Sequence, residues 1–121
     1  MKNILIVDDD AVFQTTMKDA FDAKEFTIIP AQDGNEGMQK MQEVRPDVIL
    51  LDVMMPSMNG LQFLRKLNEK FGEGAIPVLI TSNTSSIDNI SEGVTLGIRS
   101  YIVKSKESVK NIVDAVTNVL K

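Results

Sequence analysis

The sequence predicts an α/β fold in which a doubly wound, five-stranded parallel sheet lies between two layers of helices. Three observations lead to this prediction: short apolar runs recur along the chain, helical patterns separate them, and proline or glycine marks many of the junctions. The apolar runs lack polar alternation, which is typical of strands covered on both faces. Alternating strands and helices favour parallel strands with right-handed crossovers, and therefore a three-layer sandwich. A chain of 121 residues suits one core, and we expect residues 1–121 to form a single domain.

Five segments carry the strand pattern, each a short run rich in β-branched or other apolar residues. They are residues 3–7, 26–30, 47–52, 77–82 and 99–103. Four of these strands end in side chains that can do chemistry. These side chains are Asp8 and Asp9 after the first strand, Asp52 in the third, Thr81 in the fourth and Lys104 after the fifth. Because parallel strands all start from the same side, we expect these side chains to share one edge of the sheet, where ligands bind in open α/β folds.

Helical periodicity fills the intervals between the strands. The predicted helices are residues 11–24, a segment between Asp33-Gly34 and Pro46, residues 60–70, a segment capped by Ser85 or Ser86 and closing near Gly97, and a last helix carrying Val109 to Leu120. Asp10 is placed to cap the first helix, where a carboxylate also complements the helix dipole. In the second helix, Met38, Met41 and Val44 are spaced to face inward.

Composition excludes several classes of function. The absence of Cys and His removes disulfides, thiolate chemistry and the commonest general base and metal ligand. The net charge of -4 argues against direct nucleic-acid binding, which needs clustered Lys and Arg. No stretch approaches the roughly 20 apolar residues of a membrane helix. The first apolar segment runs into aspartates instead of a cleavage site, so we expect a cytoplasmic protein without membrane insertion.

Asp52 is the residue on which we expect the function to depend. It follows a strongly apolar run, and Pro56 and Gly60 break the chain into a turn after it. If the first and third strands are neighbours, about 5 Å apart, then Asp8, Asp9 and Asp52 crowd together. Their repulsion would raise a pKa or recruit a cation. A ligand set made only of oxygen atoms favours Mg²⁺, and Mn²⁺ could substitute for it.

Four motifs resemble those of the receiver domain of two-component response regulators, and the resemblance covers essentially the whole chain. They are Asp8-Asp9, the segment from Asp52 to Gly60, Thr81-Ser82, and Tyr101-Ile102-Val103-Lys104. The resemblance implies the flavodoxin-like strand order 2-1-3-4-5. It also implies that a sensor histidine kinase or a histidine phosphotransfer protein donates a phosphoryl group to Asp52, and that a downstream protein target receives the signal. Such a domain catalyses its own phosphorylation and dephosphorylation and is not a conventional enzyme.

The same resemblance implies a role for each acidic residue of the pocket. Asp52 would be the nucleophile and would form an acyl phosphate. Mg²⁺ would be held by Asp9, Asp52 and the backbone carbonyl oxygen of Met54. Asp8 would contact the cation through water. The cation would offset the charge of an anionic nucleophile that meets an anionic phosphoryl group.

The resemblance also implies how phosphorylation would be detected. Lys104 would place its ammonium on the phosphoryl oxygens, and the hydroxyl of Thr81 would donate to another oxygen of the same group. Movement of Thr81 would free space for Tyr101 to turn inward. The face formed by the fourth helix, the fifth strand and the fifth helix would then change, and a partner that prefers the changed face would shift the equilibrium.

One position departs from the family pattern. The family usually has proline after the lysine, commonly joined by a cis peptide, whereas Ser105 follows Lys104 here. A cis bond before a non-proline residue costs about 3 kcal/mol. Either the Lys104–Ser105 bond is trans and the loop differs, or the strain is retained.

Two other functions compete with this interpretation. Asp8-Asp9-Asp10 also fits the start of haloacid-dehalogenase-like phosphatases, with Asp8 as nucleophile and Asp10 as acid/base. That reading needs a longer chain and leaves Asp52 without a role. An interaction module that works without phosphorylation is the other alternative, and the presence of Thr81 and Lys104 together with the acidic residues argues against it.

Overall fold

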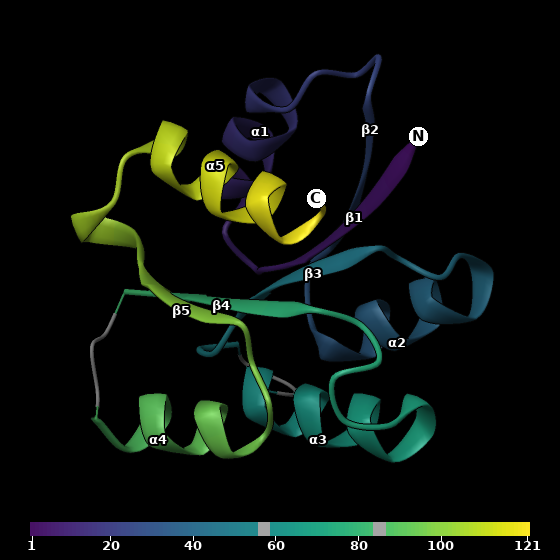
Figure 1. The fold of residues 1–121 in the computed structure, drawn as a ribbon, viewed down its shortest axis with the longest axis vertical. Helices are drawn as coiled ribbons and strands as arrows, with labels where there is room; N and C mark the ends of the chain where they lie inside the picture. The colour runs from purple at the N-terminus through teal and green to yellow at the C-terminus, as the bar shows by residue number, and fades with distance from the viewer. Residues whose placement is uncertain (56–58, 84–86) are drawn as a thin grey trace.

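The computed structural model describes residues 1–55, 59–83 and 87–121 (Figure 1). Strands and helices alternate along the chain in the predicted order. They are β1 (Lys2–Val7), α1 (Ala11–Ala20), β2 (Phe26–Ala31), α2 (Gly34–Glu43), β3 (Val48–Asp52), α3 (Gly60–Phe71), β4 (Val78–Ser82), α4 (Ile87–Thr95), β5 (Ser100–Val103), the 3₁₀ turn η1 (Lys104–Lys106) and α5 (Val109–Val119). No helix within the described ranges is long and apolar enough to cross a bilayer.

The strands form one parallel sheet in the order β2-β1-β3-β4-β5, which confirms the predicted fold class and topology. Helices α1 and α5 cover one face of the sheet, and α2, α3 and α4 cover the other (Figure 1). Every residue of β3 and β4 is buried, because helices lie over both faces of these central strands. This burial explains why their sequences are apolar without alternation.

Each face of the sheet is covered by its own apolar cluster. The cluster on the side of α2 and α3 includes Phe63 and Leu64 of α3, and that on the side of α1 and α5 includes Met17, Ile112 and Val116. All five side chains are at most 3% exposed. Both helical layers are therefore attached to the sheet by continuous burial, and the strand ends are held at fixed positions.

The first helix is shorter than predicted, because it ends at Ala20 and not at residue 24. Phe21 takes an extended backbone conformation, although its side chain is buried. The carbonyl oxygen of Asp22 then accepts hydrogen bonds from the amides of Glu25 and Phe26, at 3.0 and 2.9 Å, which forms a turn. The buried aromatic residue just past the helix end has the spacing of a helical residue, so the sequence pattern extended the helix by one turn too many.

The second helix also ends earlier than its apolar pattern suggested. Met41 is buried and Met38 packs against the core, as predicted. The inward placement of Val44 is wrong: α2 ends at Glu43, and Val44 is extended and 39% exposed. Apolar spacing alone could not reveal that the chain leaves the helix at this residue.

Side-chain caps fix the helix starts next to the carboxyl edge of the sheet. Asp10 caps α1 as predicted. Asn59 and Gln62 form a reciprocal capping box at the start of α3, which the sequence analysis had not identified. The predicted caps Ser85 and Ser86 lie outside the described residues.

Gly60 allows α3 to begin directly against the end of β3. Its amide donates to the carbonyl oxygen of Val53 at 2.9 Å. A methyl group at this position would overlap the backbone carbonyl of Asp52 and would lie 2.8 Å from the Cα atom of Val53. Because these neighbours are backbone atoms, they cannot rotate away, and the close approach requires glycine.

We therefore expect Gly60→Ala to lower the free energy of unfolding by about 1–3 kcal/mol, measured by urea denaturation. Gly93→Ala is the matched control. Its added methyl would meet the Cδ1 atom of Ile98 at 2.9 Å, the movable end of a side chain. Alanine also gains about 1 kcal/mol in helix propensity, so the control should change stability little. Equal losses in the two variants would contradict the proposed role of Gly60.

Candidate functional site

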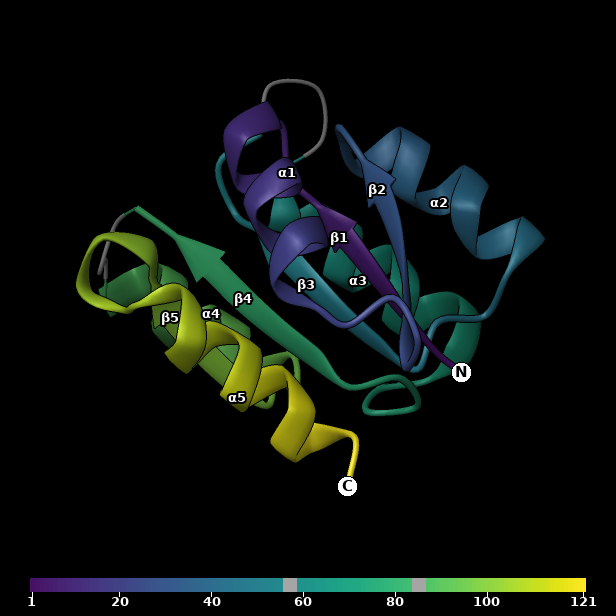
Figure 2. The same ribbon diagram turned by 90° about the horizontal axis from the view of Figure 1, so that it is seen from above.

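The parallel sheet brings the predicted site residues to one edge. Strand β3 lies between β1 and β4, and its last residue, Asp52, is paired in register with Thr81 of β4. Asp8 follows β1 on the other side, and Lys104 follows β5. The arrowheads of β1, β2 and β4 in Figure 2 point in the same direction, and β3 and β5 pair parallel with their neighbours, so these strand ends face a common edge.

Three carboxylates meet in this pocket. One oxygen atom from each of Asp8, Asp9 and Asp52 can be chosen so that all three lie within 4.8 Å of one another. Asp8 is 1% exposed and Asp52 5% exposed, whereas Asp9 is exposed. Two of the three charges are thus removed from water and placed next to each other, as predicted from the neighbouring strands.

Burial raises the pKa of both Asp8 and Asp52. Burial, and then the charge of Asp8, raise the pKa of Asp52 from 3.8 to about 6. Lys104 and the amide of Met54, which donates to Asp52 Oδ1 at 3.2 Å, oppose the increase. Burial also raises the pKa of Asp8, against the hydrogen bonds that it accepts from Lys104 and from the amide of Asp10. For both carboxylates, the loss of water on burial outweighs the stabilisation that these contacts give to the charged form.

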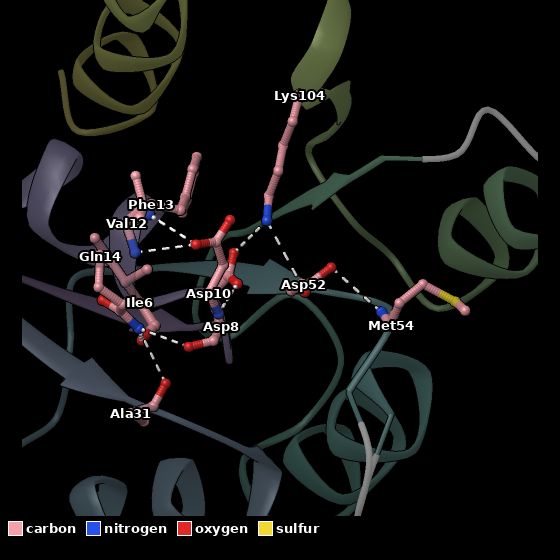
Figure 3. Close-up of polar contacts among 10 residues, drawn as sticks. All are labelled: Ile6, Asp8, Asp10, Val12, Phe13, Gln14, Ala31, Asp52, Met54 and Lys104. Atoms are coloured by element: carbon pink, nitrogen blue, oxygen red, sulfur yellow. Dashed lines mark hydrogen bonds and ion pairs between the residues drawn. The ribbon is translucent and has the colours of Figure 1, made fainter.

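The ammonium group of Lys104 brings a positive charge to the pocket. Its Nζ atom lies 2.6 Å from Asp8 Oδ2 and 3.9 Å from Asp52 Oδ2, and its side chain is 10% exposed (Figure 3). No peptide bond in the described ranges is cis, so the Lys104–Ser105 bond is trans. Of the two alternatives for this bond, the trans form is therefore correct, and Lys104 is the first residue of η1.

Thr81 presents a buried hydroxyl to the same region. Its side chain is fully buried, and its Oγ1 atom has no hydrogen-bond partner among the described residues. An unpaired buried hydroxyl costs about 1–3 kcal/mol. Tyr101 of the adjacent strand is partly buried and packs against the core cluster on the α3 side of the sheet. The Thr81 hydroxyl is therefore a donor that the described part of the chain leaves unsatisfied, on the residue paired in register with Asp52.

Gln14 is a supporting residue that the sequence analysis missed. Its Nε2 atom lies 2.8, 3.1 and 3.0 Å from the carbonyl oxygens of Ile6, Asp8 and Ala31 (Figure 3). The side chain thus links α1 to the ends of β1 and β2, directly behind the acidic turn. A lone glutamine in a helix carries no motif, so only the folded arrangement reveals this contact.

Phe13 lies in the first predicted helix and carries no motif in the sequence. In the structure its ring centroid lies 4.3 Å from the Nζ atom of Lys104. The two residues are separated by most of the chain, and no spacing rule connects them. An aromatic residue shortly after the acidic run was the only available signal.

The donor set fits a hard divalent cation such as Mg²⁺. It consists of carboxylate oxygens that lie close together, and a cation would offset the charge of Asp8, which adds to the effect of burial on the pKa of Asp52. Met54 lies beside Asp52, with its side chain 64% exposed, so only its backbone borders the pocket. Coordination by the Met54 carbonyl stays a prediction.

Comparison with known proteins gives one consistent result. Residues 4–117 match the family model described as the response regulator receiver domain. Protein PilH of Pseudomonas aeruginosa is 30% identical over 118 residues, which cover 96% of this chain and 98% of that protein. The regulator of RpoS of Escherichia coli is 31% identical over 103 residues, which cover 85% of this chain but only 30% of that regulator. The structure of chemotaxis protein CheY4 of Vibrio cholerae superposes with a TM-score of 0.89 at 27% identity and covers 99% of both chains.

The raised pKa of Asp52 predicts a pH-dependent stability. With metal removed by EDTA, folding disfavours the carboxylate form, so Asp52 lowers the free energy of unfolding above its folded pKa of about 6. Asp52→Asn should therefore stabilise the protein by about 1–3 kcal/mol at about pH 7.5. The gain should shrink as the pH falls through about 6 and vanish near the ordinary value of 3.8.

Urea denaturation of both proteins across this pH range measures the difference. Asp19→Asn is the control, because Asp19 is exposed at the far end of α1 and should lack this profile. A destabilising effect of Asp52→Asn at neutral pH without metal would contradict the electrostatic account.

Proposed function

The chain belongs to the response regulator receiver domain family, and on that premise we propose that Asp52 is the residue that accepts the phosphoryl group. Receiver domains of this family accept a phosphoryl group in signal transduction and bind Mg²⁺ at an acidic pocket. One observation carries the assignment: Asp52 is a buried carboxylate between Asp8 on one neighbouring strand end and Thr81 on the other. We also propose that residues 1–121 act as one receiver domain.

In the proposed reaction, a carboxylate oxygen of Asp52 attacks the phosphorus atom of a phosphohistidine. The bond between phosphorus and oxygen forms as the bond between phosphorus and nitrogen breaks. The electron pair returns to the imidazole, which takes up a proton, and Asp52 becomes an acyl phosphate. Lys104 supplies an ammonium to the phosphoryl oxygens, and Thr81 donates its hydroxyl to another of them. Positioning and charge supply most of the catalysis in such a transfer.

The metal ligands are proposed to be Asp9, Asp52 and the backbone carbonyl of Met54, with Asp8 in contact through water. When bound, Mg²⁺ would offset the negative charges of the nucleophile and of the phosphoryl group. The close approach of the carboxylate oxygens supports this ligand set. Mn²⁺ would substitute, because it shares the preference for oxygen ligands.

The partners are proposed from the same chemistry. A sensor histidine kinase or a histidine phosphotransfer protein would donate the phosphoryl group, and a downstream protein would bind the modified domain. We place these encounters in the cytoplasm. The net charge of -4 favours protein partners over direct contact with nucleic acid.

The output is proposed to arise from Thr81 and Tyr101. Donation by Thr81 to the phosphoryl group would satisfy a hydroxyl that has no partner among the described residues. As Thr81 moves toward Asp52, space opens for Tyr101, which lies on the neighbouring strand and is only partly buried. The face made by α4, β5 and α5 would then change, and a partner selective for that face would shift the population.

The phosphatase alternative is disfavoured by the position of Asp10. Its carboxylate accepts hydrogen bonds from the amides of Val12 and Phe13, at 3.0 and 3.2 Å, so it serves as the cap of α1. The buried pair formed by Asp8 and Lys104 likewise disfavours a module independent of phosphorylation, because a purely structural surface needs no such desolvated ion pair.

Chemical trapping tests the assignment of Asp52. After reaction with acetyl phosphate and Mg²⁺, borohydride reduction should convert the modified side chain to homoserine, which peptide mass spectrometry would locate at position 52. Asp52→Asn should lose the label, and the matched control Asp19→Asn should retain it, since Asp19 is exposed on α1. A label at position 8 would favour the phosphatase instead.

Tyrosine fluorescence tests the switch. The sequence contains one Tyr and no Trp, so the tyrosine emission comes from Tyr101 alone. Beryllium fluoride with Mg²⁺ should reduce quenching by acrylamide in the wild type, because the ring turns inward. Thr81→Val keeps the shape but lacks the donor, so quenching should not change, while ¹⁹F NMR verifies that the adduct forms. Equal protection in both proteins would disprove the coupling.

A further inference from the structure

The ammonium of Lys104 lies between two acids and one aromatic ring. Its Nζ atom is 2.6 Å from Asp8 Oδ2, 3.9 Å from Asp52 Oδ2 and 4.3 Å from the ring centroid of Phe13. A lysine ammonium within about 6 Å of a ring centroid is attracted by the negative face of the ring. This attraction grows when water is excluded, and the Lys104 side chain is only 10% exposed.

Lys104 lies immediately after the edge strand β5. Lys104 begins the three-residue turn η1, whose start has no side-chain cap hydrogen bond. Its flexible side chain must cross from the end of β5 to the pocket, as Figure 3 shows. Contacts at the far end of the side chain therefore set the position of the ammonium.

Phe13, in contrast, is held in place from two sides. Its amide donates to the capping carboxylate of Asp10 at 3.2 Å, in the first turn of α1. Its side chain packs against the apolar cluster between α1, α5 and the sheet. The ring is thus attached to a helix and to a core, and it can serve as a fixed reference for a mobile cation.

The ring differs from the two acids in one respect that matters for the reaction. Asp8 is the strongest of the three partners, but it belongs to the acidic cluster that fits a divalent cation. A carboxylate engaged with a cation attracts Lys104 less. The uncharged ring does not ligate hard cations, so its attraction for Lys104 persists whatever Asp8 binds.

We propose that Phe13 is a positioning residue. Its ring holds the Lys104 ammonium beside Asp52 when Asp8 is engaged with a divalent cation. The inference rests on the proposed function, in which Lys104 contacts the phosphoryl oxygens. Phe13 touches no reacting atom and acts through Lys104 alone.

NMR tests the contact between Lys104 and the Phe13 ring without any phosphoryl chemistry. The ε-methylene protons of Lys104 should resonate upfield of the other lysines, because of the ring current of Phe13, and should stay there when Mg²⁺ is added. Phe13→Leu should abolish the upfield shift, and Phe13→Tyr should keep it. The inference would be overturned if the ε-methylene protons of Lys104 had ordinary chemical shifts in the wild type, or if they moved to ordinary values when Mg²⁺ is added.

Affinity for beryllium fluoride tests the consequence. Phe13→Leu should weaken its binding about 3- to 10-fold, the loss of one partly desolvated cation–π contact. In a Lys104→Met background the same change should have no further effect. Phe26→Leu is the matched control, because Phe26 packs against the same cluster but its recorded ring contact is with Phe21. Site-specific trifluorophenylalanine at position 13 keeps the ring and its packing while it weakens the ring quadrupole, and it should reproduce the loss.

These outcomes separate the inference from the function on which it rests. If Lys104→Met leaves the affinity for beryllium fluoride unchanged, the proposed role of Lys104 fails. If Lys104→Met weakens binding but Phe13→Leu and the fluorinated ring do not, the inference alone fails. An equal loss from Phe13→Leu in the presence and absence of Lys104 would reduce Phe13 to a packing residue.

Discussion

Three carboxylates confined to one pocket are the constraint on which the rest of this structure depends. Parallel strands deliver Asp8, Asp9 and Asp52 to the same edge, and burial of two of them removes the water that would otherwise screen their repulsion. The fold offsets this repulsion only in part, with the ammonium of Lys104 and a few backbone amides. Burial first, and the charge of Asp8 second, raise the pKa of Asp52 to about 6. A pocket that holds these carboxylates is suited to receive a cation, and Asp52, the proposed nucleophile, stays largely ionised at neutral pH.

The first turns of α1 organise much of this pocket, although none of their side chains belongs to the reacting set. Asp10 caps the helix and its amide binds Asp8, Gln14 links the helix to the carbonyls of β1 and β2, and Phe13 lies against Lys104. Each contact uses a different chemistry, and together they fix the turn that carries the acids. Such support explains how a turn containing three consecutive aspartates keeps one conformation near a charged centre.

The pocket also contains one departure from the rule that buried polar groups form hydrogen bonds. The hydroxyl of Thr81 is fully buried without a hydrogen-bond partner in the described part of the chain, a cost that packing elsewhere must offset. Departures of this kind concentrate at sites of binding or switching, because a group that already has a hydrogen-bond partner gains little by moving to a new one. Because Thr81 pairs with Asp52 across β3 and β4, the unpaired hydroxyl lies one strand away from the proposed phosphoryl group.

The sequence by itself determined the fold class, the strand order through family resemblance, and the residues of the pocket, because buried parallel strands need continuous apolar runs and their carboxyl ends must share an edge. Strand limits were correct to within one residue, whereas α1 and α2 ended early, because the backbone becomes extended at Phe21 and Val44 despite their apolar spacing. Only the tertiary structure decided how Lys104 is held, that its bond to Ser105 is trans, and that Gln14 and Phe13 support the pocket. Contacts of this kind join side chains that lie far apart in the sequence or on different elements, and no local period or motif encodes the packing that brings them together.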